Sequence, residues 1–151
     1  MLELLHLQKT GIIEAYTAIF TYSDAHEWNK VKLFLDDILT VDYSSLNSQP
    51  AALISREDLI AAWSAFLPRF TFTMHFLSNH HVFVQGEGAT ASCYGHAIHQ
   101  LQGAEGGDFW EVYGSYNFSL RRAADAWLVT SIRYNHRYAG GNLNLPVIAS
   151  R

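Results

Sequence analysis

Hydrophobic positions in the first part of the chain repeat with a helical period. Between residues 4 and 20 they recur every three or four positions, which predicts one amphipathic helix with a single buried face. A short second helix is expected over residues 28–35, with Ser23 or Asp24 as its N-terminal cap. A third helix is expected after Ser55, where an acidic first turn follows the capping hydroxyl and a proline ends the apolar pattern.

The hydrophobic period changes from helical to two near residue 70. A shorter alternating segment at residues 38–43 also predicts a strand, and a polar loop is expected over residues 44–51. Short glycine-containing connections between the later segments are typical of hairpins. The long strands predicted after residue 70 cover residues 71–85, 89–102, 109–122 and 126–137.

Helices followed by an antiparallel meander predict an α+β fold. We expect three N-terminal helices packed on one face of a strongly curved, mainly antiparallel sheet, in the manner of a cone-like α+β barrel. A curved sheet folded against helices leaves a cavity at its mouth, where a ligand would bind.

The alternation of each long strand predicts which side chains face that cavity. His99 shares a small apolar face with Ala91 and Cys93, so its imidazole needs a polar partner. A core histidine bonded to a backbone carbonyl and a catalytic histidine are both compatible with this pattern. His96 has the opposite parity and faces away, which excludes a shared metal for this H-x-x-H pair. Of the remaining histidines, His80 is expected at the surface or in a turn.

The first long strand has the least regular alternation. Its apolar positions predict one face that holds Phe72, Phe76, Val82 and Val84, and an opposite face that holds His75. In the third long strand the even positions form the apolar face, which consists of Trp110, Val112, Gly114, Tyr116, Phe118 and Leu120.

Composition narrows the class of protein. The 151 residues weigh 17.0 kDa and are 49% hydrophobic but only 16% charged, which fits one domain with a real core. A net charge of −4 argues against a nucleic-acid or anionic-membrane partner. A single cysteine, Cys93, excludes an intrachain disulfide, and the N-terminus lacks a signal-peptide pattern, so we expect a cytoplasmic protein.

The order of elements, together with the segments Gly-Ser-Tyr-Asn-Phe-Ser-Leu-Arg-Arg and Asp-Ala-Trp-Leu-Val, resembles the SnoaL-like members of the nuclear transport factor 2-like superfamily. The resemblance implies one such domain over residues 1–151. Four positions are similar to the catalytic residues of the scytalone dehydratase family. They are Asp24 before Trp28, Tyr43 in Val-Asp-Tyr-Ser, His75 in Thr-Met-His-Phe and His99 in Ala-Ile-His-Gln.

Other positions depart from the pattern of that family. Ser23 stands where the family has a second water-binding tyrosine, and Gly114 and Tyr116 replace its serine and asparagine. These three residues are expected to line the substrate pocket. The family's aromatic C-terminal helix, which covers the pocket, has no counterpart in the tail that begins at Gly140.

The resemblance implies a cofactor-independent dehydratase without a metal. It would remove water from a small cyclic or aromatic β-hydroxy carbonyl compound, with two imidazoles as base and acid in unassigned order. Asp24 is expected to bond one ring nitrogen of His99, and Tyr43 to bind the carbonyl oxygen. The partner would be a small hydrophobic or aromatic molecule. A homo-oligomer, dimer or trimer, is expected through the outer sheet face around Tyr94 and His96.

Three alternatives remain open at this point. A SnoaL-like polyketide cyclase or a ketosteroid-isomerase-type enzyme would use the same acid–base residues on another substrate. A non-catalytic domain that binds a small ligand would tolerate replacement of Asp24, His75 and His99. The same three residues could also form a facial triad for a metal ion, although their spacing is not typical of one.

Overall fold

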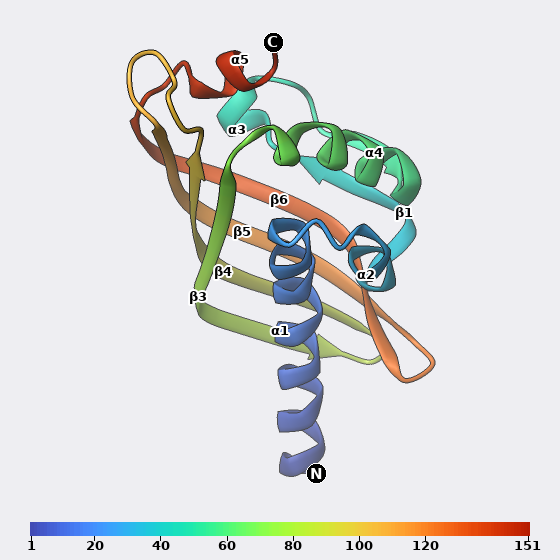
Figure 1. Ribbon diagram of the computed structural model, residues 1–151. Helices are drawn as coiled ribbons and strands as arrows, with labels where there is room; N and C mark the ends of the chain where they lie inside the picture. The colour runs from blue at the N-terminus through green and yellow to red at the C-terminus, as the bar shows by residue number, and fades with distance from the viewer.

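The apolar face of the first helix lies against a curved sheet in the computed structural model, which describes residues 1–151 (Figure 1). Helix α1 (Leu2–Asp24) buries Ile12, Tyr16 and Ile19 completely, as its helical spacing predicts. Helices α2 (Trp28–Val31) and α4 (Arg56–Phe66) lie on the same side of the sheet as α1. The α+β fold class is therefore confirmed.

The sheet is open and has six strands. Its order is β2-β1-β6-β5-β4-β3, and every neighbouring pair is antiparallel except β1 and β6, which are parallel. Strands β2 and β3 are the two edges, so the curved sheet does not close into a barrel. The strands are β1 (Leu35–Asp42), β2 (Ala52–Ser55), β3 (Phe72–Gln85), β4 (Gly88–Gln100), β5 (Phe109–Ala123) and β6 (Ala126–Gly141).

Of the two predicted helix N-caps, one is confirmed and the other is wrong. The Ser55 hydroxyl accepts a hydrogen bond from the backbone N–H of Asp58 at 3.0 Å, as expected for the start of α4. Ser23 and Asp24 do not cap the second helix, because α1 continues through both of them. That second helix is shorter than predicted, and a 3₁₀ turn, η1 (Lys32–Phe34), follows it.

Short elements were missed where the sequence pattern is too brief to show a period. The predicted polar loop contains helix α3 (Ser44–Asn47), and edge strand β2 follows it. A second 3₁₀ turn, η2 (Leu67–Arg69), follows α4. The C-terminal tail forms helix α5 (Leu145–Ala149), whose buried Leu145 packs in a small cluster with Phe70.

A bulge in β3 changes which residues face the helices. The pairing with β4 shifts between Ser78 and His81, where Asn79 adopts a left-handed backbone with φ of 57°. The predicted common face of Phe76 and Val82 is therefore wrong, because the inward parity changes at the bulge. The same shift turns His80 inward, and its Nδ1 lies 2.6 Å from the hydroxyl of Tyr16.

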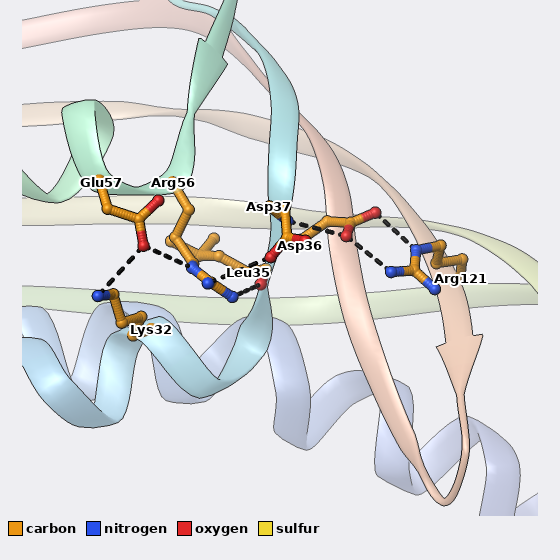
Figure 2. Close-up of polar contacts among 7 residues, drawn as sticks. All are labelled: Lys32, Leu35, Asp36, Asp37, Arg56, Glu57 and Arg121. Atoms are coloured by element: carbon orange, nitrogen blue, oxygen red, sulfur yellow. Dashed lines mark hydrogen bonds and ion pairs between the residues drawn. The ribbon is translucent and has the colours of Figure 1, made fainter.

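Ion pairs connect the start of β1 to helix α4 and to strand β5 (Figure 2). Arg121 forms a bidentate pair with Asp36, at 2.6 Å from Nε to Oδ2 and 2.8 Å from Nη2 to Oδ1. Arg56 at the start of α4 reaches Asp37 at 3.2 Å and donates to the carbonyl of Leu35 at 3.3 Å. The contacts of Arg56 fasten the start of α4 to β1, and α4 forms one wall of the candidate site.

The main core lies between α1 and the sheet. It joins α1 to residues of β1, β4, β5 and β6, while the smaller cluster around Phe70 lies beside α5. No helix combines the length and the apolar character needed to cross a membrane.

Candidate functional site

A cavity of about 260 Å³ opens between the end of α1, helices α3 and α4, and the sheet. Eleven of its fifteen lining residues are hydrophobic, which is typical of a site for a small apolar molecule. The lining residues are Phe20, Ser23, Tyr43, Leu46, Asn47, Trp63, Phe66, Leu67, His75, Ala97, His99, Trp110, Val112, Tyr116 and Tyr134. Of the seven residues predicted for the site, five line this cavity.

Asp24 lies behind the cavity and contacts it through His75. One carboxylate oxygen, Oδ1, accepts hydrogen bonds from Thr73 Oγ1 at 2.8 Å and from His75 Nδ1 at 2.7 Å. The other, Oδ2, accepts from the backbone N–H of His75 at 2.8 Å. The end of α1 is thereby fastened to the inward face of β3, and the hydrogen bond at Nδ1 orients the imidazole of His75.

These contacts determine the tautomer of His75. A neutral imidazole that donates from Nδ1 to a carboxylate carries its lone pair on Nε2. The side chain of His75 is 12% exposed and lines the cavity, so this lone pair is the candidate base. A proton gained there would form an imidazolium that stays hydrogen-bonded to the Asp24 carboxylate.

The predicted hydrogen bond between Asp24 and His99 is wrong. Asp24 ends a helix that packs on edge strand β3, whereas His99 lies on β4, the next strand inward. The carboxylate therefore meets the histidine of β3 first. The rings of His75 and His99 are 6.0 Å apart, centre to centre, and lie edge to face.

His99 is a buried neutral histidine. Its Nδ1 lies 3.3 Å from the carbonyl oxygen of Trp110, and its ring packs between Trp110 and Phe70, at 4.3 and 5.1 Å between ring centres. Burial, with a smaller contribution from the nearby His75, lowers the pKa of His99 to about 4. The backbone-carbonyl interpretation of this residue is confirmed, and the same residue also lines the cavity.

Three tyrosines form the wall across the sheet from these histidines. Tyr43 follows the last residue of β1, Tyr116 comes from β5 and Tyr134 from β6. Their rings lie close together, with centres 5.8 Å apart for Tyr43 and Tyr134 and 5.1 Å for Tyr116 and Tyr134. Burial raises the pKa of all three phenols, to about 12 for Tyr134, so they remain hydrogen-bond donors at neutral pH.

Two glycines leave room for these rings. A Cβ at Gly95 would overlap the ring of Tyr116, and one at Gly114 would overlap the ring of Tyr134 and the backbone of β6. The expectation that Gly114 lines the pocket is therefore wrong, because Tyr134 occupies the space beside it. Tyr134 was not predicted as a site residue. Its position two residues after Ile132 on β6 places it on the same buried face, so the alternation of that strand could have indicated it.

No group of three or more His, Cys, Asp or Glu side chains is arranged to hold a metal ion. Asp24 is hydrogen-bonded to His75, and the ring centre of His99 is 6.0 Å from that of His75. These three side chains therefore do not form the facial triad of metal ligands. A larger depression of about 610 Å³ is lined mainly by polar side chains, among them His80 and Arg133. It contains none of the four predicted catalytic residues.

The fold is similar to several solved structures. The Kfla4162 protein from Kribbella flavida superposes with a TM-score of 0.89 at 26% identity, over 95% of this chain and 99% of that one. A candidate scytalone dehydratase from Novosphingobium aromaticivorans gives 0.77 at 16% identity, over 93% and 91%. A LinA-type3 hexachlorocyclohexane dehydrochlorinase from Novosphingobium barchaimii gives 0.72 at 14% identity, over 91% of both chains.

The sequence itself has no significant match among curated proteins. The model of the SnoaL-like domain family, however, matches residues 6–133, which is most of the chain. The cone of helices and curved sheet agrees with that match. The chain therefore belongs to the family of SnoaL-like domains.

Proposed function

We propose that this protein is a lyase that removes water from small, neutral, cyclic β-hydroxy carbonyl compounds by acid–base catalysis. The observation that carries the proposal is the Asp24–His75 pair, which presents one free imidazole nitrogen to an aromatic cavity. The names of several structural neighbours, which include dehydratases and a dehydrochlorinase, are compatible with elimination chemistry.

The first step is removal of the proton on the carbon next to the carbonyl group. His75 Nε2 takes this proton, and the electron pair of the C–H bond moves onto the carbonyl oxygen as an enolate. Asp24 stabilises the resulting imidazolium through its short hydrogen bond. The neutral phenols of Tyr43 and Tyr116 supply hydrogen bonds for the enolate oxygen.

The second step expels the β-hydroxyl group. The enolate electrons form the carbon–carbon double bond while the C–O bond breaks, and the His75 imidazolium returns its proton to the leaving oxygen. Water leaves, and His75 is neutral again. His99 does not supply this proton, because its low pKa keeps it neutral at pH 7.

The cavity wall also indicates the charge of the substrate. No lysine, arginine, aspartate or glutamate lines it, so a carboxylate or phosphate group would enter without a counter-charge. A neutral ring compound fits both the aromatic walls and the volume of about 260 Å³.

The test is an elimination assay on a panel of cyclic β-hydroxy ketones, followed by the absorbance of the conjugated enone. His75→Ala should lower turnover by on the order of 10²–10⁴-fold, which is typical for loss of a general base. His81→Ala is the matched control, because His81 is exposed on the same strand and does not line this cavity. Full activity of His75→Ala on a compound that the wild type converts would contradict the proposal.

Asp24→Asn tests the other member of the pair. The amide keeps one oxygen acceptor but removes the charge beside the imidazolium, so turnover should fall by on the order of 10²-fold or more while the protein still folds. Glu14→Gln, at an exposed carboxylate on the same helix, should leave turnover unchanged. A melting curve for each variant separates lost chemistry from lost structure, and an Asp24→Asn enzyme with wild-type turnover would exclude a catalytic pair.

A second candidate reaction is the elimination of hydrogen chloride. It is favoured by one observation, which is that the cavity holds no positively charged side chain besides the His75 imidazolium formed during the reaction. Chloride leaves without a proton, so base removal by His75 alone would suffice. Release of chloride from a chlorinated cyclohexane, absent in His75→Ala, would favour this reaction over dehydration.

A further inference from the structure

The hydroxyl group of Ser23 is buried at the cavity without a hydrogen-bond partner. Ser23 is only 2% exposed, it lies one residue before Asp24 near the end of α1, and it lines the cavity beside Phe20 and His75. Its Oγ makes no hydrogen bond within the protein. A serine in a helix ordinarily bonds the carbonyl four residues earlier or reaches solvent, and Ser23 does neither.

Three neighbouring side chains each have one polar atom that already has a partner, whereas His75 Nε2 is free for the proposed chemistry. His75 Nδ1 is bonded to Asp24, and His99 Nδ1 faces the carbonyl of Trp110. Asn47 accepts the backbone N–H of Gln49. An unpaired hydroxyl among them costs free energy in the empty protein, and an oxygen atom of a bound molecule would remove that cost.

We propose that Ser23 is a specificity-determining residue that hydrogen-bonds a second oxygen substituent of a ring-shaped ligand. The inference rests on the proposed function for the first oxygen, which is the one held by the tyrosines. It narrows the substrate class to neutral ring compounds with at least two oxygen substituents. A ring with a single oxygen leaves Ser23 unpaired.

Aromatic alcohols test this preference without any chemical reaction. Phenol carries one oxygen, and catechol, resorcinol and hydroquinone carry two at different spacings, yet none of them can lose water. Titration calorimetry should show at least one diol binding to the wild type about 2–10-fold more tightly than phenol, as expected for one additional hydrogen bond. In Ser23→Ala this advantage should disappear, while phenol binding stays within about twofold of wild type.

Thr17→Ala is the matched control. Thr17 is on the same helix and its Oγ1 is also buried without a partner, but it does not line the cavity. This variant should keep the diol preference. Ser23→Ala should melt at the same temperature as the wild type or higher in the absence of ligand, because the change removes an unpaired polar group.

Two results would overturn the inference. One is a wild-type protein that binds no diol more tightly than phenol, and the other is a diol preference that persists in Ser23→Ala. The result is independent of turnover, because none of these aromatic alcohols can lose water. A diol preference without any elimination activity would support the role of Ser23 and contradict the proposed function. Elimination activity without a diol preference would support the proposed function and contradict the role of Ser23.

Discussion

At the scale of single residues, the site depends on two histidines held in opposite electrostatic environments. His75 faces a carboxylate, whereas His99 faces a backbone carbonyl among aromatic rings. The same imidazole group is therefore a base that can gain a proton in one place and a neutral ring in the other. The difference comes from the strand and the neighbour of each residue.

The buried His99 makes stability depend on pH. Its pKa is about 4 in the folded protein and 6.5 as the reference value, so between these two pH values the unfolded chain binds a proton that the folded protein does not. Stability should therefore fall as the pH is lowered from about 6.5 to about 4, by on the order of 3 kcal/mol from this group. Below that range both states are protonated and the contribution no longer changes.

Urea unfolding of the wild type and of His99→Gln at several pH values measures this contribution. The variant cannot titrate at this position, so its stability should fall less steeply over the same range. Titrating groups that do not interact with His99 affect both proteins equally and cancel in the comparison. Parallel curves for the two proteins would show that His99 is protonated as easily in the folded protein as in the unfolded chain.

At the scale of elements, the site depends on close contacts between neighbouring strands. Gly95 on β4 lies under the ring of Tyr116 on β5, and Gly114 on β5 lies beside the ring of Tyr134 on β6. Each glycine allows the ring of the next strand to lean across it. The tyrosine wall is therefore a property of three paired strands, and no single strand could form it.

Gly95→Ala should disturb this wall. The added Cβ overlaps the ring of Tyr116, which is held by packing, so we expect a loss of about 1–3 kcal/mol in the free energy of unfolding and weaker ligand binding. Gly88→Ala is the control on the same strand, because its Cβ would have only ordinary contacts, at 3.7 Å or more. Thermal unfolding of both variants checks the difference, and equal stability would show that the ring of Tyr116 moves freely.

At the scale of the whole molecule, the side of the sheet that faces away from the helices carries many exposed aromatic rings. Phe76, Tyr94, Phe109 and Tyr138 are 47%, 56%, 48% and 61% exposed, and they come from four neighbouring strands. His96 lies among them, stacked on Tyr113 with 4.1 Å between the ring centres. A group of exposed aromatic rings on one face is typical of a protein interface.

We therefore expect the protein to form a homo-oligomer through this face. Light scattering should give a mass that is a multiple of 17.0 kDa, and Tyr94→Lys should shift it toward the monomer, because a buried lysine without a partner is unfavourable at an interface. Lys9→Ala, on the opposite side of the sheet, should leave the mass unchanged. A wild-type mass near 17.0 kDa at every concentration would contradict the expectation.

Periodicity in the sequence determined the division into helices and long strands. The apolar face of β5 was predicted correctly because the strand is long and regular. The predicted face of α1 is buried from Ile12 to Phe20 but not at Leu4 and Leu7, which are 60% and 61% exposed. Elements of four or five residues, such as α3, β2 and α5, contain too few positions to show a period and were missed. The resemblance to a family identified four candidate catalytic residues, which are Asp24, Tyr43, His75 and His99.

Only the tertiary structure decided which of these residues meet. Alternation along β3 does not reveal the bulge at Asn79. Before the bulge the odd-numbered residues, such as His75, face inward, and after it the even-numbered residues, such as His80, do. The partner of Asp24 depends on how α1 crosses the sheet, and that crossing brings it to β3 before β4. The neutral state of His99 and the unpaired hydroxyl of Ser23 likewise follow from burial, which is created by packing between distant parts of the chain.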